Sequence, residues 1–214
     1  MSNRFLLSLV LLLFIFSTCT ETKYSRFTLT DSKRIDSTDL PSLFKSAEKA
    51  PLYKAAVNLY GKKFGGLLLI KNMADSSYRI VFTTETGIKL FDFEIKGEKF
   101  TVHYCIEKFN RDAVLNTIAS DIKLLLLENR KNQTAQLLSR SEEPSKIYRF
   151  TSEKTQDYYF TNSENKQLKE LRQVMGKKTK VVIALQYGAG IVPNNIHIAH
   201  KNIRLKIDLN LLER

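Results

Sequence analysis

The three histidines, His103, His197 and His200, are the first candidates for chemistry, because imidazole serves as a metal ligand and as a general base. His197 and His200 are three residues apart in a strand-like segment, so their side chains point to opposite faces and cannot share a metal ion without a bulge. We expect both at the surface. The patterns His-Glu-x-x-His, Cys-x-x-Cys and Gly-x-Ser-x-Gly are all missing from the sequence. The sequence therefore predicts no metal site, no cofactor and no enzymatic activity.

Two carboxylates in the predicted strand 88–95 could perform acid–base work. Asp92 and Glu94 share one face of this strand, while Phe91 and Phe93 lie on the other face. Either the acids line an interior, or they face solvent while the phenylalanines point inward. We favour the second arrangement.

A lipid anchor is the third kind of chemistry. After Arg4, residues 5–16 form an apolar run of about 12 residues, which is too short to span a bilayer and is typical of a secretion signal. The small residues that follow lead directly to Cys19, and this arrangement resembles the lipobox of bacterial lipoproteins. The resemblance implies that residues 1–18 are a signal peptide and that Cys19 is acylated. Ordinary secretion with cleavage near Thr18, or an uncleaved anchor, are the alternatives.

Composition indicates a folded chain with a basic surface. The apolar fraction is 43%, with 13 Phe and 9 Tyr, and the net charge is +12. A secretion signal argues against nucleic acid as the partner, and anionic lipid headgroups suit this charge better. A solvated surface without a partner is the favoured alternative, because the lysines are spread along the chain. Cys105 is predicted to be a small buried residue.

The predicted domain organisation has three parts: the signal peptide 1–18, the lipidated Cys19 with a flexible tether to residue 38, and a single domain over 39–214. The tether is rich in Thr, Ser, Lys and Asp and has no apolar periodicity. At the start of the domain, Asp39 could cap a short helix with Pro41 in its first turn.

Apolar alternation predicts about ten strands, five of them before the main helix. Short connections between the first five favour an antiparallel meander. Residues 129–145 are polar and are interpreted as a loop. The predicted strands lie near 53–59, 67–70, 78–82, 88–95, 100–106, 147–150, 158–160, 181–185, 196–198 and 203–209.

One long helix is predicted over residues 110–127, after the fifth strand. Asn110 is the expected N-cap, and Asp112 in the first turn is favourable for the helix dipole. Apolar residues follow at spacings of three and four, which gives one wide apolar face that must cover a sheet. These are Val114, Leu115, Ile118, Ala119, Ile122, Leu125 and Leu126.

The large number of apolar residues is compatible with two alternative kinds of interior. A sheet curved around one helix could fill with its own side chains, or it could keep a slot that accepts an apolar guest such as an acyl chain. Periodicity alone favours the filled core.

The order of elements resembles the LolA/LolB-type lipoprotein carriers and receptors, and the loose lipobox with Lys/Asn-rich strands resembles uncharacterised lipoproteins of Bacteroidetes-like bacteria. Three stretches carry the first resemblance: residues 60–70 as paired first strands with a glycine turn, residues 82–90 as a strand, small turn and strand, and residues 193–207 as a closing hairpin after Pro193. It covers about residues 52–210. It implies an α+β fold: a single antiparallel, strongly curved sheet, an open half-barrel, with the helix against its concave face.

The resemblance implies a lipoprotein, anchored through Cys19 in the bacterial cell envelope at the outer membrane, that binds an acyl chain or lipoprotein cargo between sheet and helix. A structural or scaffold lipoprotein with a filled core is the alternative, and an envelope hydrolase using unidentified acids is a third possibility. The residues expected to line the cavity are Leu67, Leu69, Ile80, Phe82, Leu90, Phe91, Phe93, Val102, Leu115, Ile118 and Ile122.

Overall fold

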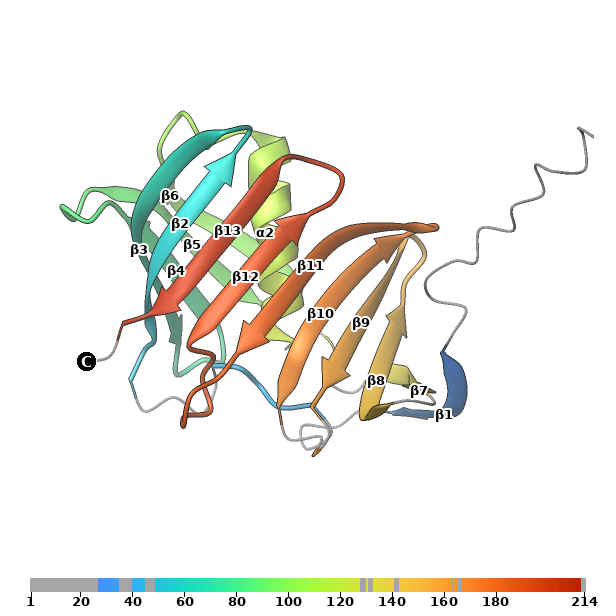
Figure 1. The fold of residues 1–214 in the computed structure, drawn as a ribbon. Helices are drawn as coiled ribbons and strands as arrows, with labels where there is room; N and C mark the ends of the chain where they lie inside the picture. Colours follow the sequence, from blue (N-terminus) through green and yellow to red (C-terminus); the bar gives the residue numbers. More distant parts are fainter. Residues whose placement is uncertain are drawn as a thin grey trace, which may run out of the picture.

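The computed structural model describes residues 27–34, 40–44, 49–127, 130, 133–140, 143–162, 164 and 167–212. These residues form thirteen strands and one long helix (Figure 1). The elements are β1 (Thr28–Arg34), β2 (Leu52–Leu59), β3 (Lys62–Asn72), β4 (Tyr78–Thr83), β5 (Lys89–Lys96), β6 (Lys99–Cys105), α2 (Asp112–Leu126), β7 (Thr134–Arg140), β8 (Glu143–Thr151), β9 (Thr155–Thr161), β10 (Leu168–Met175), β11 (Lys178–Gln186), β12 (Asn195–His200) and β13 (Leu205–Leu211).

All thirteen strands belong to one antiparallel sheet, in the order β1-β7-β8-β9-β10-β11-β12-β13-β2-β3-β4-β5-β6. Two meanders, β2 to β6 and β7 to β13, are joined where β13 pairs with β2, with Leu205 opposite Leu59 and Leu211 opposite Tyr53. β1 and β6 stand at the two edges, so the sheet does not close. The fold is thus a single unclosed antiparallel sheet, as the sequence predicts.

The sheet curves strongly around α2. β3 to β6 turn behind the helix, while β11, β12 and β13 pass in front of it (Figure 1). The main apolar core lies in this hollow and combines the inner sides of both meanders with residues 124–127 at the end of α2. A second, smaller cluster centred on Tyr158 and Phe160 of β9 contains no residue of α2.

Three strands were not predicted, and each has a physical reason. β1 lies within the segment expected to be a flexible tether; six of its seven residues are exposed, so it carries no apolar pattern. β7 lies in the predicted loop 129–145. β10 contains two bulges, which place its buried Leu168 and Leu171 three residues apart instead of two or four. The prediction of about ten strands is therefore corrected to thirteen.

The helix predicted over residues 110–127 is present, but its two ends and its place among the strands differ from the prediction. α2 spans Asp112–Leu126 and follows the sixth strand, because β1 precedes the predicted meander. Asn110 is not the N-cap: Arg111 occupies that position without a side-chain cap, and Leu127 ends the helix in the left-handed region at φ 61°. None of the helices in the described part of the chain is both long and apolar enough to cross a bilayer.

Two predicted features lie outside the described residues. These are the signal peptide 1–18 with Cys19, and Asp39, the expected cap of the short helix; the described residues 40–44, where the first turn of that helix was expected, are not helical. Leu40, Leu43 and Phe44 are described, and all three are buried in the main core.

The acids of β5 face away from the core. Phe91, Phe93 and Ile95 are buried in the hollow, whereas Asp92 accepts a hydrogen bond from Arg79 and lies 3.0 Å from Lys89 Nζ. Glu94 contacts Arg79 and His103 on the same side. Asp92 is nevertheless only 5% exposed. Its hydrogen bond with Arg79 is the main reason why the pKa of Asp92 lies below its ordinary value.

Asp92→Asn should lower the free energy of unfolding by about 1–2 kcal/mol at pH 7, since the partners Arg79 and Lys89 are partly screened by solvent. A depressed carboxylate pKa stabilises the fold above the unfolded-state value of about 4, and this stabilisation is lost as the pH falls further. Urea unfolding at pH 7 and pH 3.5 should therefore show a smaller difference between variant and wild type at the lower pH. Glu94→Gln, at a more exposed position, is the control and should cost less.

Candidate apolar ligand cavity

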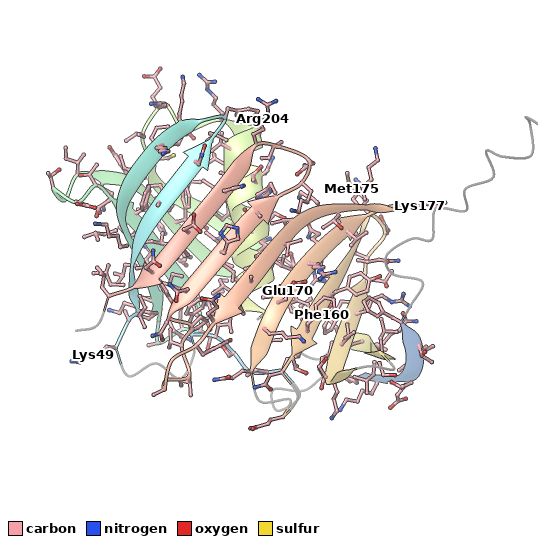
Figure 2. All side chains as sticks on the ribbon, in the orientation of Figure 1. Lys49, Phe160, Glu170, Met175, Lys177 and Arg204 are labelled. Atoms are coloured by element: carbon pink, nitrogen blue, oxygen red, sulfur yellow. The ribbon has the colours of Figure 1, made fainter. Side chains whose placement is uncertain are left out.

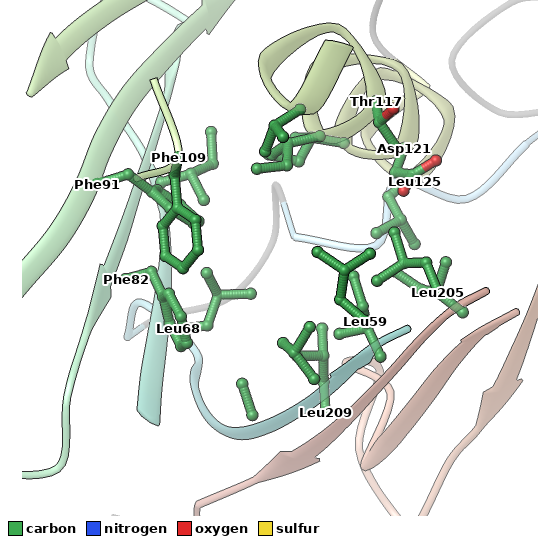
Figure 3. A pocket seen from close by; sticks show the side chains of 18 of the residues that line it. Leu59, Leu68, Phe82, Phe91, Phe109, Thr117, Asp121, Leu125, Leu205 and Leu209 are labelled. Carbon is green, nitrogen blue, oxygen red and sulfur yellow. The ribbon is translucent and has the colours of Figure 1, made fainter. Parts of the chain in front are cut away.

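A cavity of about 320 Å³ lies between α2 and the concave face formed by β2 to β5, β12 and β13 (Figure 3). Its wall is almost entirely hydrocarbon; Tyr60, Thr117 and Asp121 supply the only polar side chains among its lining residues. The lining comprises Phe44, Ala55, Val57, Leu59, Tyr60, Phe64, Leu68, Ile70, Ile80, Phe82, Phe91, Phe109, Ala113, Val114, Thr117, Ile118, Asp121, Ile122, Leu125, Leu126, Ile198, Ile203, Leu205, Ile207 and Leu209.

The cavity has a closed end and an open end. Beside the last turn of α2 it is lined by Leu125 and Leu126, and by Phe44, all of which are 2–3% exposed. Beside the first turn of α2 it is lined by the exposed Ala113 and by Tyr60, which is 62% exposed. The cavity therefore runs along the helix and opens near its N-terminus.

Aromatic rings form one wall. The ring centroids of Phe82 and Phe91 are 5.3 Å apart, and Phe91 stacks on Phe93 at 4.3 Å (Figure 3 labels Phe82 and Phe91). Near the mouth, Phe64 and Phe109 meet edge to face at 5.9 Å. Rings in tilted or edge contact form a firm apolar surface for a ligand to lie against.

Glycine in β3 makes room for this wall. A Cβ built on Gly66 would stand 2.1 Å from the carbonyl oxygen of Thr83 and 2.8 Å from the Phe82 ring, whereas a Cβ on Gly65 would meet only Ala55 O, at 3.9 Å. The Phe82 ring thus fills the space that a side chain at position 66 would need.

Gly66→Ala should therefore displace the Phe82 ring and the β4 backbone and cost about 1–3 kcal/mol of stability, the usual range for overpacking. Gly65→Ala is the matched control in the same strand and should change the stability by less than about 0.5 kcal/mol. Thermal unfolding of the two variants measures the difference. Equal stabilities would show that β4 yields easily and that the wall is not fixed by Gly66.

Two polar groups of the wall form hydrogen bonds within the protein, whereas Asp121 Oδ1 is buried and has no hydrogen-bond partner among the described residues. The Thr117 hydroxyl donates to the Ala113 carbonyl at 2.7 Å. Asp121 Oδ2 lies 2.8 Å from His200 Nε2, and both residues are buried, which ties α2 to β12. Burial raises the pKa of the Asp121 carboxyl above its ordinary value. His200 is thus an interior residue, contrary to the surface position expected from the sequence, while His197 is exposed and pairs with Asp208.

A polar network lies on the other side of the hollow, among the apolar core residues of β8 to β11. Lys180 Nζ contacts Gln173 Oε1 at 3.1 Å and Ser120 Oγ at 3.4 Å, and Gln173 donates to Asp157 at 3.0 Å. Asp157 also pairs with Arg130. These charges connect α2 with β9, β10 and β11, whereas the cavity lies in the half of the hollow formed by β2 to β5, β12 and β13.

The structure brings together five of the eleven residues that the sequence suggests as lining: Ile80, Phe82, Phe91, Ile118 and Ile122. The other six lie elsewhere. Phe93, fully buried, packs behind Phe91 and against Phe100. Leu90 and Leu115 are partly buried and pack against the core, and Val102 is 38% exposed on the edge strand β6. Leu67 and Leu69 are half-buried and alternate with Leu68 and Ile70, which line the cavity.

Sequence reasoning missed the floor of the cavity. Ala55, Val57 and Leu59 of β2 and the residues 205, 207 and 209 of β13 line it. Their period-two alternation is visible in the sequence. What the sequence does not show is that β13 pairs with β2, which places both sets under α2.

No protein-family model matches the sequence, and no curated protein matches it. Among solved structures, a LolA superfamily protein from Nitrosomonas europaea matches with a TM-score of 0.50 at 8% identity, covering 79% of this chain and 87% of that chain. A DUF1329 family protein from Desulfovibrio piger gives a TM-score of 0.40 at 11% identity over 78% of this chain and 85% of the other. An exported protein with a YmcC-like fold from Bacteroides fragilis gives 0.27 at 10% identity over 80% and 98%. The first of these likenesses identifies the fold as LolA-like.

Proposed function

We propose that this protein, whose fold is LolA-like, is a binding protein that takes up an acyl chain, either of a lipid or of a lipoprotein cargo, in the cavity beside α2. The observation that carries the proposal is the cavity itself: an apolar space of about 320 Å³ whose lining is buried beside the last turn of α2 and exposed beside the first. Its volume lies at the lower end of the range of ligand pockets.

The shape and chemistry of the cavity suit a hydrocarbon chain. A smaller apolar cavity of about 150 Å³ stays dry and accepts apolar guests. Burial of a chain here would contribute roughly 25 cal/mol per Å² of apolar surface removed from water. Because the lining is almost entirely hydrocarbon, affinity would come mainly from contact area rather than from hydrogen bonds.

Binding is proposed in preference to catalysis. Thr117 donates to the helix backbone, and Asp121 is held by His200 beneath the helix. These pairings give Thr117 and Asp121 a structural role in holding α2, which supports binding as the proposed function.

For the location we propose anchoring through acylated Cys19 in a bacterial cell envelope, at the outer membrane. The support is the leader sequence and the lipobox-like residues before Cys19. Labelling of expressing cells with a clickable fatty acid should mark the wild-type protein and leave Cys19→Ser unmarked. Equal labelling of both proteins would rule out acylation at Cys19.

The test of ligand binding is native mass spectrometry of protein lacking the leader and carrying Cys19→Ser. The expected result is a fraction with the added mass of a co-purified acyl lipid, displaced by an added fluorescent fatty acid. A clean apo mass together with no fatty-acid uptake would reject the carrier and favour a scaffold lipoprotein that acts through contacts at its surface.

A further inference from the structure

The mouth of the cavity is formed by three neighbouring segments. The turn between β2 and β3 lies beside the loop between β12 and β13, because Tyr60 N donates to Arg204 O at 2.8 Å. The same hairpin meets the loop before α2 through the contact of Phe64 with Phe109. Figure 2 shows Arg204 on this rim, at the top of the sheet. The three segments thus make one continuous surface around the opening.

This rim is strongly basic. Each of the three segments contributes two exposed basic side chains, while the acidic ones on the rim are Glu107 and Asp112. The basic residues are Lys62, Lys63, Lys108, Arg111, Lys201 and Arg204.

Two basic groups at the opposite end of the fold have acidic partners. Lys96 lies 2.9 Å from Asp75, and Lys123 lies 3.2 Å from Glu98. On the rim, Lys201 and Arg204 form no ion pair with any of the residues that the structure describes. The positive charge at the mouth is therefore available to an external anion.

Apolar groups stand among these charges. The Tyr60 ring is 62% exposed, and Ile203 lines the opening. Lys108 Nζ lies 5.0 Å from the centroid of the Phe64 ring. An aromatic ring with a wet hydroxyl surrounded by lysines and arginines is the composition that suits the headgroup region of a bilayer.

We infer that the rim of the cavity mouth docks on an anionic bilayer surface, with the opening facing the headgroups. Six basic side chains would lie within a Debye length of the anionic headgroups, and each contributes separately to partitioning. The occupant is a lipid surface because a ring of charge around an apolar opening complements a layer of anionic headgroups above hydrocarbon. Docking in this direction would place the open end of the cavity where acyl chains are.

The inference goes beyond the proposed function, because the rim can dock whether or not the cavity is occupied. It is tested by flotation of leaderless Cys19→Ser protein with vesicles of phosphatidylcholine alone or with 30% phosphatidylglycerol. We expect flotation with the anionic vesicles only, and its loss in 0.5 M NaCl. Lys201→Gln with Arg204→Gln should weaken partitioning roughly 30-fold, for two charges removed close to the surface.

The matched control is Lys71→Gln with Lys99→Gln, two exposed lysines at the other end of the strands. If this control weakens partitioning as much as the rim variant, the vesicles attract the net charge of the whole protein and the rim assignment is wrong. The absence of flotation with anionic vesicles overturns docking altogether. Binding of an uncharged acyl probe, a fluorescent fatty-acid methyl ester, measured without vesicles should be the same in all these variants, which separates failure of docking from failure of the proposed function.

Discussion

Phe93→Ala should lower the free energy of unfolding by about 3–5 kcal/mol, the range for removal of a buried phenylalanine. Phe93 has no exposed surface, stacks on Phe91 at 4.3 Å and contacts Phe100 at 5.0 Å between ring centroids. The space left behind would be bordered by the rings of Phe91 and Phe100. Urea unfolding of the leaderless protein measures the loss.

The control for this prediction is Phe82→Ala, at a position that borders the cavity directly. Because one side of the Phe82 ring already faces open space, its removal forfeits fewer contacts and should cost less stability. Fatty-acid affinity should change in Phe82→Ala more than in Phe93→Ala. Equal losses of stability at the two positions would mean that the space beside Phe82 is filled in solution.

Ala113→Trp should close the mouth of the cavity. Ala113 lies in the first turn of α2, is exposed and lines the opening. If the indole denies the ligand about 100 Å² of apolar contact, the loss is about 2.5 kcal/mol, or roughly a 70-fold weaker Kd. Titration with a fluorescent fatty acid gives the affinity, and thermal unfolding should show a change of less than about 1 kcal/mol.

Asn116→Trp is the matched control on the same helix, because Asn116 is exposed and does not line the cavity. It should bind the fatty acid like the wild type. If both variants bind normally, ligands do not enter past the first turn of α2, and the assignment of the open end is wrong.

The sequence predicts the elements that have a clean pattern. β5 shows this well: its aromatic residues alternate with Asp92 and Glu94, and the structure places the two sets on opposite sides of the sheet. The apolar stripe of α2 likewise predicts a helix that must cover a sheet, and it differs from the observed helix by two residues at the start and one at the end. Periodicity and amphipathicity are properties of the local sequence, so they predict an element without knowledge of its distant contacts.

Other features depend on contacts distant in the chain. In β3 the run from Leu67 to Ile70 is apolar on both sides, so periodicity cannot tell which residues face the cavity. The pairing of His200 with Asp121 joins residues 79 positions apart, and no spacing rule predicts it. β1 is recognisable only by its pairing with β7, since all of its residues except Leu29 are polar.

The adjacency of β2 and β13 has a consequence for how the protein matures. About 150 residues separate Leu59 from its partner Leu205, and the ligand space lies under this seam. Pairs so far apart in the chain are slow to form, because a long loop must be ordered before their contacts can stabilise it. During synthesis β13 is the last of the described strands to emerge, so the apolar side of the first meander stays uncovered until then. A nascent chain of this protein should therefore need protection from aggregation until β13 has been made.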